Sequence, residues 1–159
     1  MRAAVLTVST SRAAGEGGDE SGDALAEFAE GLGAEVAGRE VIPDDRELIA
    51  ERLRHWADEE RCELVLTTGG TGFTPRDLTP EATRAVIDRE APGIPEAMRG
   101  ASRPHTKHWM LSRAVAGIRN RTLIVNFPGS PKSIAEAGDA IASALPHALD
   151  LIAGRSSPH

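Results

Sequence analysis

Short apolar runs alternate along the chain with longer segments in which apolar residues recur every three or four positions. The apolar runs predict strands at residues 3–8, 35–42, 64–67 and 122–126. The helical spacing predicts helices at residues 46–59, 80–88, 95–101 and 134–145. A further helix is expected after Asp23, which can act as its N-cap, and Gly33 is expected to end it. Alternating strands and helices predict a three-layer α/β fold, with a mostly parallel sheet and helices on both faces.

The pattern leaves a few segments less clearly defined. Residues 102–109 are polar without a clear period, and Pro146 can either kink the last helix or start a new turn. The helix at 80–88 should begin at Thr79 as N-cap, with Pro80 in its first turn. We expect a single domain at residues 1–153 and a flexible C-terminal tail at 154–159.

Composition narrows the possible partners. The chain has 159 residues, of which 40% are hydrophobic and 26% charged, and its net charge is −6. These values are typical of a globular domain, and a negative charge argues against binding to nucleic acid or to an anionic membrane. A single cysteine, Cys62, cannot form an internal disulfide, which favours the cytoplasm. We find neither an export signal nor an apolar stretch of about 18 residues that could span a membrane.

Small, polar and acidic residues follow the predicted strands. In an open parallel sheet, ligands bind beyond the carboxyl ends of the strands, where loops and helix N-termini converge. The segments at these ends are 9–11, 43–45, 68–72 and 126–130. Glycines let backbone N–H groups approach a ligand, hydroxyls add hydrogen bonds, and helix N-termini add partial positive charge. This edge therefore suits a phosphate group, even in an acidic protein.

The segment Gly69-Gly70-Thr71-Gly72 is the most distinctive of these loops, although it lacks the spacing and the lysine of a P-loop. A tight strand-to-helix turn without a ligand would explain it equally well. A ligand is favoured by Arg76, which can pair with a phosphate, and by Asp77, which can bind a metal ion.

Two acidic positions at strand ends are candidates for a shared Mg²⁺ site. Asp44 and Asp77 follow different strands, and neighbouring parallel strands would bring them together. Mg²⁺ is commonly bound by one or two carboxylates together with substrate phosphates. The alternative is that an aspartate here only caps the following helix, which is the favoured interpretation for Asp45.

Other candidates have simpler explanations. Cys62 and Trp56 are expected to pack in the core. His105 and His108 have the spacing of two metal ligands, but no third ligand lies nearby in the sequence. Ser112-Arg113 could either cap a helix or contact a phosphate.

Four separated motifs resemble one known family. They are LTVS at 6–9, LTTGGTGFTPRDLTPEAT at 66–83, LSRAVAGIR at 111–119 and NFPGSPK at 126–132. In these motifs the chain resembles the molybdenum cofactor biosynthesis proteins of the MogA, MoaB and gephyrin G-domain type, over nearly its whole length. The family implies a three-layer α/β fold that is usually trimeric. In the MogA branch it also implies Mg²⁺-dependent transfer of AMP from ATP to the terminal phosphate of molybdopterin, with release of pyrophosphate.

The resemblance also implies site residues. The two essential acids of the family, which would serve both catalysis and metal binding, fall on Asp44 and Asp77. Contacts to molybdopterin and the nucleotide are implied at Ser9, Thr10, Asp19, Ser21, Gly22, Thr68, Gly69, Gly70, Thr71, Gly72, Arg76, Ser112, Asn126, Pro128, Gly129 and Ser130. The first strand often ends in Ser-Asp in the family but ends in Ser9-Thr10 here, which removes an acid and weakens a metal role for this loop.

The resemblance leaves the branch of the family open. A MoaB-like carrier or scaffold would bind molybdopterin without adenylyltransferase activity, and a nucleotide-binding regulator would bind ATP without a pterin pocket. An active enzyme implies ATP and molybdopterin as substrates, a homotrimer, and hand-over of the product to a molybdenum insertion protein.

Overall fold

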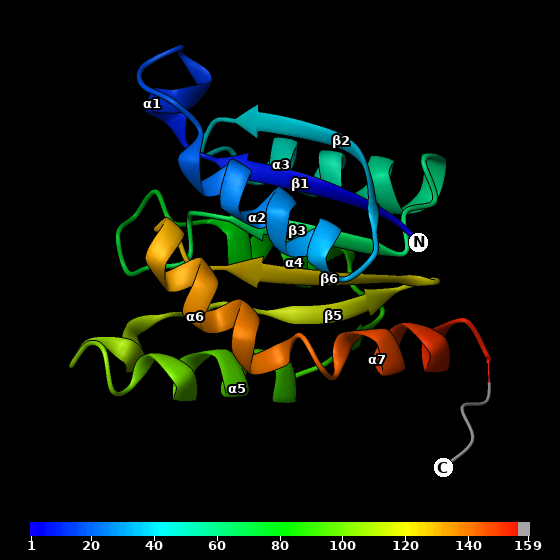
Figure 1. The fold of residues 1–159 in the computed structure, drawn as a ribbon. Coiled ribbons are helices and arrows are strands. Elements are labelled where there is room, and N and C mark those ends of the chain that lie inside the picture. Colours follow the sequence, from blue (N-terminus) through cyan, green and yellow to red (C-terminus); the bar gives the residue numbers. More distant parts are fainter. Residues whose placement is uncertain (156–159) are drawn as a thin grey trace.

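The computed structural model describes residues 1–155, which form a six-stranded sheet with helices on both faces (Figure 1). The strands lie in the order β2 (Glu35–Ile42), β1 (Arg2–Val8), β3 (Leu64–Thr68), β6 (Thr122–Phe127), β5 (Ala116–Arg119) and β4 (Arg89–Glu90). The first four are parallel, β5 is antiparallel to β6, and β4 is antiparallel to β5. This arrangement confirms the predicted three-layer fold.

Helices cover the sheet in two layers. The helical segments are α1 (Thr10–Ala13), α2 (Glu20–Gly31), α3 (Arg46–Arg54), the π-helix η1 (His55–Glu59), α4 (Thr79–Val86), α5 (Gly93–Ser102), the 3₁₀-helix η2 (Trp109–Leu111), α6 (Pro131–Ile141) and α7 (Leu145–Ile152). In Figure 1, α2, α6 and α7 lie in front of the sheet, and α3 and α4 lie behind it. No helix in the described part of the chain has the length and apolarity that crossing a bilayer requires.

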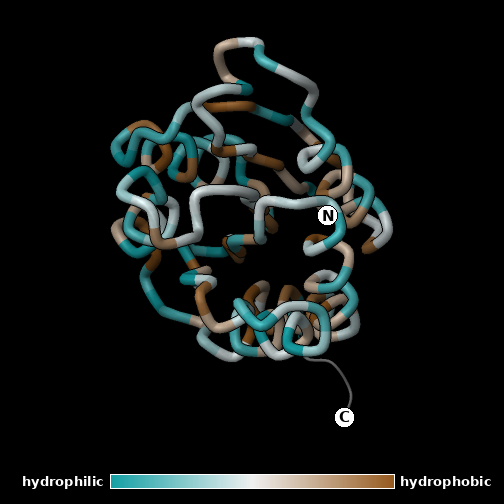
Figure 2. The backbone as a smooth tube through the Cα atoms, turned by 90° about the vertical axis from the view of Figure 1, so that its left-hand side faces the viewer, coloured by the Kyte–Doolittle hydropathy of each residue, from teal (hydrophilic) through white to brown (hydrophobic). Residues whose placement is uncertain are grey.

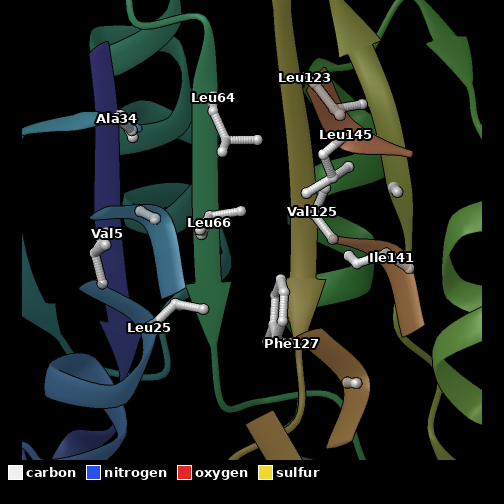
Figure 3. Close-up of a cluster of buried hydrophobic side chains, with 14 of the residues drawn as sticks. Val5, Leu25, Ala34, Leu64, Leu66, Leu123, Val125, Phe127, Ile141 and Leu145 are labelled. Carbon is white, nitrogen blue, oxygen red and sulfur yellow. The ribbon is translucent and has the colours of Figure 1, made fainter. Parts of the chain in front are cut away.

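Strand side chains alternate between two apolar cores. In β1, Val5 belongs to the core under α2, α6 and α7, whereas Leu6 belongs to the core under α3 and α4. In β3, Leu66 belongs to the first of these cores and Val65 to the second. Both faces of these strands are therefore buried, which explains why the sequence shows continuous apolar runs there instead of an alternating pattern. Figure 3 shows the first core, where Phe127 of β6 is fully buried.

Several predicted boundaries were wrong. The helix expected after Asp23 begins at Glu20, because the Asp19 carboxylate accepts a hydrogen bond from the Gly22 N–H at 3.1 Å and acts as the N-cap. Thr79 does not cap α4 with its side chain, because its hydroxyl instead donates to the Gly69 carbonyl at 2.9 Å. The helix predicted at 134–145 is two helices, and Pro146 lies in the first turn of α7.

The sequence pattern did not predict the short strands β4 and β5, the short helix α1, or the ordered backbone at residues 154–155. The strands β4 and β5 are only two and four residues long, which is too short for a periodic signal. The short helix α1 lies within a segment that was expected to be loop. Gly154 and Arg155, assigned to a flexible tail, are held by backbone hydrogen bonds to Leu151 and Asp150, while residues 156–159 lie outside the described part.

Candidate active site

Four loops meet at the carboxyl edge of the parallel strands. They begin directly after Val8, Ile42, Thr68 and Phe127. Ser9 N–H donates to the Ile42 carbonyl at 2.8 Å, and the Thr68 hydroxyl donates to the Pro128 carbonyl at 2.6 Å. Chain order reverses between β1 and β3, and this switch point is where open α/β sheets bind ligands. Figure 2 views the molecule from this edge.

Asp44 is positioned by the loop that follows β1. Its Oδ2 accepts hydrogen bonds from the Thr10 N–H at 3.1 Å and the Thr10 hydroxyl at 2.8 Å. The Asp44 N–H donates in return to Thr10 Oγ1 at 3.0 Å. Thr10 therefore holds the neighbouring carboxylate in place, which an acid at this position would repel. Asp45 caps α3 by accepting from the Leu48 N–H at 3.1 Å, as expected.

Asp77 is held in the same way by another threonine. Its Oδ2 accepts from the Thr74 N–H and the Thr74 hydroxyl, both at 2.9 Å. Thr74 was not among the predicted site residues, although Thr74 and Asp77 have the Thr-x-x-Asp spacing of a capping box. Both aspartates are half-buried, and within residues 1–155 the second oxygen of each, Oδ1, accepts no hydrogen bond from the protein.

The glycine-rich loop approaches its neighbours at backbone distance. Gly69 and Gly70 have φ angles of +93° and +69°, which side-chain-bearing residues rarely adopt. A Cβ at Gly69 would lie 2.4 Å from the Val8 carbonyl oxygen, and one at Gly70 would lie 2.3 Å from Thr79 Oγ1. The two glycines therefore permit β3 to turn into α4 beside the end of β1.

The expectation that neighbouring strands carry Asp44 and Asp77 was wrong, because β1 lies between β2 and β3. The two loops still share one edge of the sheet, and their donor set fits Mg²⁺. Each aspartate offers an oxygen that accepts no bond from residues 1–155, and carboxylate oxygen is a preferred ligand of this ion. The same residues contain no group of three or more His, Cys, Asp or Glu that could hold a metal ion alone. Such a site would need oxygens from a bound phosphate, which is usual for Mg²⁺.

Several residues that the resemblance implied as ligand contacts use their side chains within the protein. Asn126 is fully buried, where its Oδ1 accepts from the Val115 N–H and its Nδ2 donates to Thr67 and Thr83. The Asp19 carboxylate accepts from the Thr7 hydroxyl, the Gly22 N–H and Arg39. These internal hydrogen bonds orient the loops in which the two residues lie.

The remaining implied residues lie at or near the edge. Ser21 is buried and donates to the Gly129 carbonyl at 2.6 Å, which ties α2 to the loop after β6. Ser9 and Ser130 cap α1 and α6. Arg76 is exposed, whereas Thr71 is buried. All these residues belong to the four loops or to the helices that start from them.

A cavity of about 160 Å³ extends the edge beyond β6. Ser112 and Pro128, two of the implied residues, line it together with Arg99 and Trp109. Arg99 donates to the carbonyls of Ser112 and Ala114 at 3.2 and 3.1 Å. The polar stretch 102–109, which had no predicted element, supplies part of the wall through Thr106 and His108.

Arg113 links the glycine-rich loop to α4. Its Nε donates to the Gly72 carbonyl and its Nη2 to the Asp77 carbonyl, both at 2.7 Å, and its Nη1 pairs with Glu81 at 2.5 Å. The backbone N–H of Arg113 also donates to the Thr71 carbonyl at 2.8 Å. The sequence allowed either a helix cap or a phosphate contact for Ser112-Arg113, and in the structure Arg113 supports the loop that carries Asp77.

Replacing Arg113 by Lys is expected to lower the free energy of unfolding by about 1–3 kcal/mol and to weaken ligand binding at the loop. A lysine keeps the charge but cannot bond two carbonyls and a carboxylate in a fixed fork. Urea denaturation of the variant measures the loss. The exposed Arg103, replaced in the same way, is the control, and equal stability of the two variants would contradict a supporting role for Arg113.

The fold and this edge define an α/β protein whose glycine-rich loop, helix N-termini and two aspartates gather at the carboxyl ends of its parallel strands. The family profile described as "Probable molybdopterin binding domain" matches residues 4–147. The chain therefore belongs to the molybdopterin-binding family, which agrees with the resemblance of its motifs.

Individual relatives are similar over most of the chain. The molybdopterin adenylyltransferase of Helicobacter pylori strain J99 is 49% identical over 115 residues, which are 72% of this chain and 65% of that protein. The enzyme of the same name from Escherichia coli K12 is 49% identical over 65% of this chain and 53% of its own length. The aligned region thus spans less than two thirds of these relatives.

Solved structures match more completely. The molybdopterin biosynthesis enzyme MoaB of Thermus thermophilus superposes with a TM-score of 0.90, at 49% identity and with 97% of both chains covered. The molybdopterin biosynthesis Mog protein of Mycobacterium ulcerans gives a TM-score of 0.89, at 40% identity over 95% of this chain and 98% of the other.

Proposed function

We propose that this protein transfers AMP from ATP to the terminal phosphate of molybdopterin and releases pyrophosphate. The observation that carries the proposal is that Asp44 and Asp77 lie in loops at the same edge of the sheet, after β2 and β3, which flank β1. Each is oriented by a threonine, and each keeps an oxygen that accepts no bond from residues 1–155. The relatives named molybdopterin adenylyltransferase support the same reaction.

In this reaction a phosphate oxygen of molybdopterin attacks the α-phosphorus of ATP. The new P–O bond joins AMP to molybdopterin, and the bond between the α-phosphorus and the oxygen bridging to the β-phosphorus breaks, so that pyrophosphate leaves with that electron pair. The main obstacle is the repulsion between two polyanions. The protein must therefore supply positive potential and fix both substrates in line.

The chain's own groups can supply much of this potential. Backbone N–H groups at Gly69–Gly72 and at Ser130, the N-cap of α6, are suited to contact phosphate oxygens. Arg76 is an exposed guanidinium in the same loop as Asp77. The cavity beside Ser112 and Pro128 adjoins this edge and offers room for part of a substrate.

Asp44 and Asp77 are the residues that would hold Mg²⁺. The bound ion would neutralise charge on the phosphates of ATP. The threonine contacts fix the direction of each carboxylate, so that both can act without rearranging.

Incubation of the purified protein with molybdopterin, ATP and Mg²⁺ tests the proposal. We expect adenylylated molybdopterin and pyrophosphate in equal amounts, and neither product when Mg²⁺ is removed with a chelator. A carrier would bind molybdopterin but release no pyrophosphate with any metal ion. A nucleotide-binding regulator would bind ATP but not molybdopterin. Either result would contradict the proposed activity.

The proposal extends to assembly and partners. The exposed side chains of Phe73, Met110 and Leu111 lie in or near the site loops, and such apolar groups suit contacts between copies of the chain in a homotrimer. We further propose a cytoplasmic protein that hands its product to a molybdenum insertion protein. Light scattering of the purified chain measures the oligomeric state, and a monomer would contradict the trimer.

A further inference from the structure

A second cavity lies at the opposite edge of the sheet from the candidate active site. Its volume is about 560 Å³, within the range of about 300–1,000 Å³ that is usual for small-molecule sites. Its walls come from the end of η1 and the segment leading into β3, from the turn between β5 and β6, and from the end of α7. In Figure 1 this turn and the end of α7 lie on the right, and α1 lies on the left.

Three arginines line this cavity: Arg61, Arg121 and Arg155. Arg155 is engaged, since its Nε donates to Asp150 at 2.9 Å. Arg61 and Arg121 make no ion pair or side-chain hydrogen bond with any residue between 1 and 155. Both residues are exposed, so their guanidinium groups are accessible to a ligand that enters the cavity.

The carboxylates on the same walls already have partners. Asp58 accepts from Arg119 Nη2 at 2.7 Å and from Asn120 Nδ2 at 3.0 Å, and the Arg119 guanidinium lowers the pKa of Asp58. Glu63 accepts from the Arg2 N–H at 2.6 Å. Arg119 therefore neutralises Asp58, whereas the Glu63 carboxylate bonds a neutral amide and keeps its charge. Within residues 1–155, two unpaired arginines, Arg61 and Arg121, against this one carboxylate leave the lining net positive, which favours an anion.

Arg61 has an unusual backbone conformation. Arg61 and Asn120 both have a φ of +52°, a left-handed conformation that Asn tolerates but Arg rarely adopts. The segments that carry them are tied together, because the Thr122 hydroxyl donates to the Cys62 carbonyl at 2.6 Å. Glycine would take this conformation of residue 61 without strain, so backbone geometry alone does not account for an arginine there.

The rest of the wall is apolar. It includes Ala57, Leu149 and Ala153, together with Cys62, which is 1% exposed. Burial raises the pKa of the Cys62 thiol, so this side chain is neutral and acts as a small apolar surface. An occupant of this cavity would therefore meet both guanidinium groups and apolar side chains.

We propose that this cavity is a second ligand site, which binds a small molecule carrying a phosphate group on a ring. The phosphate would pair with Arg61 and Arg121, since guanidinium groups bind phosphate in a fork. The ring would lie against Ala57, Leu149 and Ala153. This site is separate from the site proposed for AMP transfer, which lies at the other end of the same strands.

Nuclear magnetic resonance titration of the ¹⁵N-labelled protein with AMP tests the proposal. We expect the amide signals of residues 61–63 and 120–122 to shift with saturation. Shifts at Gly69 and Gly70 would report the candidate active site separately, so the two sites can be followed in one experiment. Saturable shifts confined to the loops at residues 9–11, 43–45, 68–72 and 126–130 would overturn the second site.

Two variants and a matched control sharpen the test. Arg61→Gly and Arg121→Ala should each raise the dissociation constant at this site about tenfold or more, as expected for the loss of a charge-assisted hydrogen bond. Arg61→Gly should keep its thermal midpoint, because glycine accepts the φ of +52°. Arg89→Ala removes the same charge from the exposed strand β4 and should leave AMP binding unchanged.

Two further probes separate the parts of the ligand. Adenosine lacks the phosphate and inorganic phosphate lacks the ring, so both should bind at least about tenfold more weakly than AMP. Equal binding of adenosine and AMP would overturn the role of the arginines. Equal binding of inorganic phosphate and AMP would overturn the role of the apolar wall.

Discussion

Replacing Asp77 by Asn is expected to reduce AMP transfer at least about 100-fold while the protein stays folded. The side-chain oxygen of Asn can still accept the two hydrogen bonds from Thr74, so the loop keeps its anchor. What disappears is the negative charge and the carboxylate oxygen Oδ1, which faces no protein donor within residues 1–155. The variant therefore separates the chemical role of Asp77 from its part in the loop. The rate of pyrophosphate release measures the effect.

Asp44→Asn should behave in the same way, because Thr10 can hold an amide oxygen as it holds the carboxylate. Asp45→Asn is the matched control next to it. Asp45 only caps α3, and Asn is an equally good N-cap, so this variant should keep both stability and activity. A double variant of Asp44 and Asp77 that still releases pyrophosphate at the normal rate would refute the proposed site.

The sequence predicted which loops form the carboxyl edge of the sheet. It did not predict which polar residues of these loops form hydrogen bonds within the protein. Apolar runs and glycines follow from simple rules, since a buried parallel strand is apolar on both faces and a left-handed turn needs glycine. The four loops were therefore located correctly. A polar residue at a strand end, however, looks the same in the sequence whether it faces a ligand or a neighbouring backbone group.

Asn126 illustrates this limit. Its position after an apolar strand favoured a ligand contact, and the resemblance implied the same role. In the structure its side chain is buried and joins β6 to Thr67 of β3 and Thr83 of α4, while the ligand contact stays a prediction. That arrangement depends on three segments that are far apart in the sequence, and no local pattern contains it.

Thr10 illustrates the opposite case. Its departure from the usual Ser-Asp was interpreted as a lost acid, which weakens metal binding at this loop. The structure shows that the threonine makes three hydrogen bonds with Asp44. A threonine at position 10 thus removes the carboxylate usual in the family and orients the carboxylate of Asp44. This contact between Thr10 and Asp44 could not be inferred until β1 and β2 were known to be neighbours.

The two edges of the sheet differ in how they can attract anions. At the carboxyl edge, helix N-termini and backbone N–H groups provide the positive potential, and two aspartates remain available for a cation. At the amino edge, the guanidinium groups of Arg61 and Arg121 provide it directly. An acidic chain can therefore bind phosphorylated ligands at both edges by local arrangement, without a basic surface overall.

Replacing Gly69 by Ala is expected to lower the free energy of unfolding by about 2–4 kcal/mol. Two costs combine, because alanine is strained at a φ of +93° and its Cβ would lie 2.4 Å from the Val8 carbonyl oxygen. That oxygen belongs to the backbone of β1, which is paired on both sides, and has little freedom to move. The turn would have to shift, and with it the hydrogen bond from Thr79 to the Gly69 carbonyl.

Urea denaturation of the Gly69→Ala variant measures this loss, and Gly129→Ala provides the matched control for stability. Gly129 lies in the neighbouring loop, where a Cβ would meet only Gly69 Cα at an ordinary contact distance of 3.8 Å. We expect Gly129→Ala to change the unfolding free energy by less than about 1 kcal/mol. Equal stability of the two variants would show that the close approach of β1 to the glycine-rich loop is not needed, and the geometry proposed for phosphate binding would lose its basis.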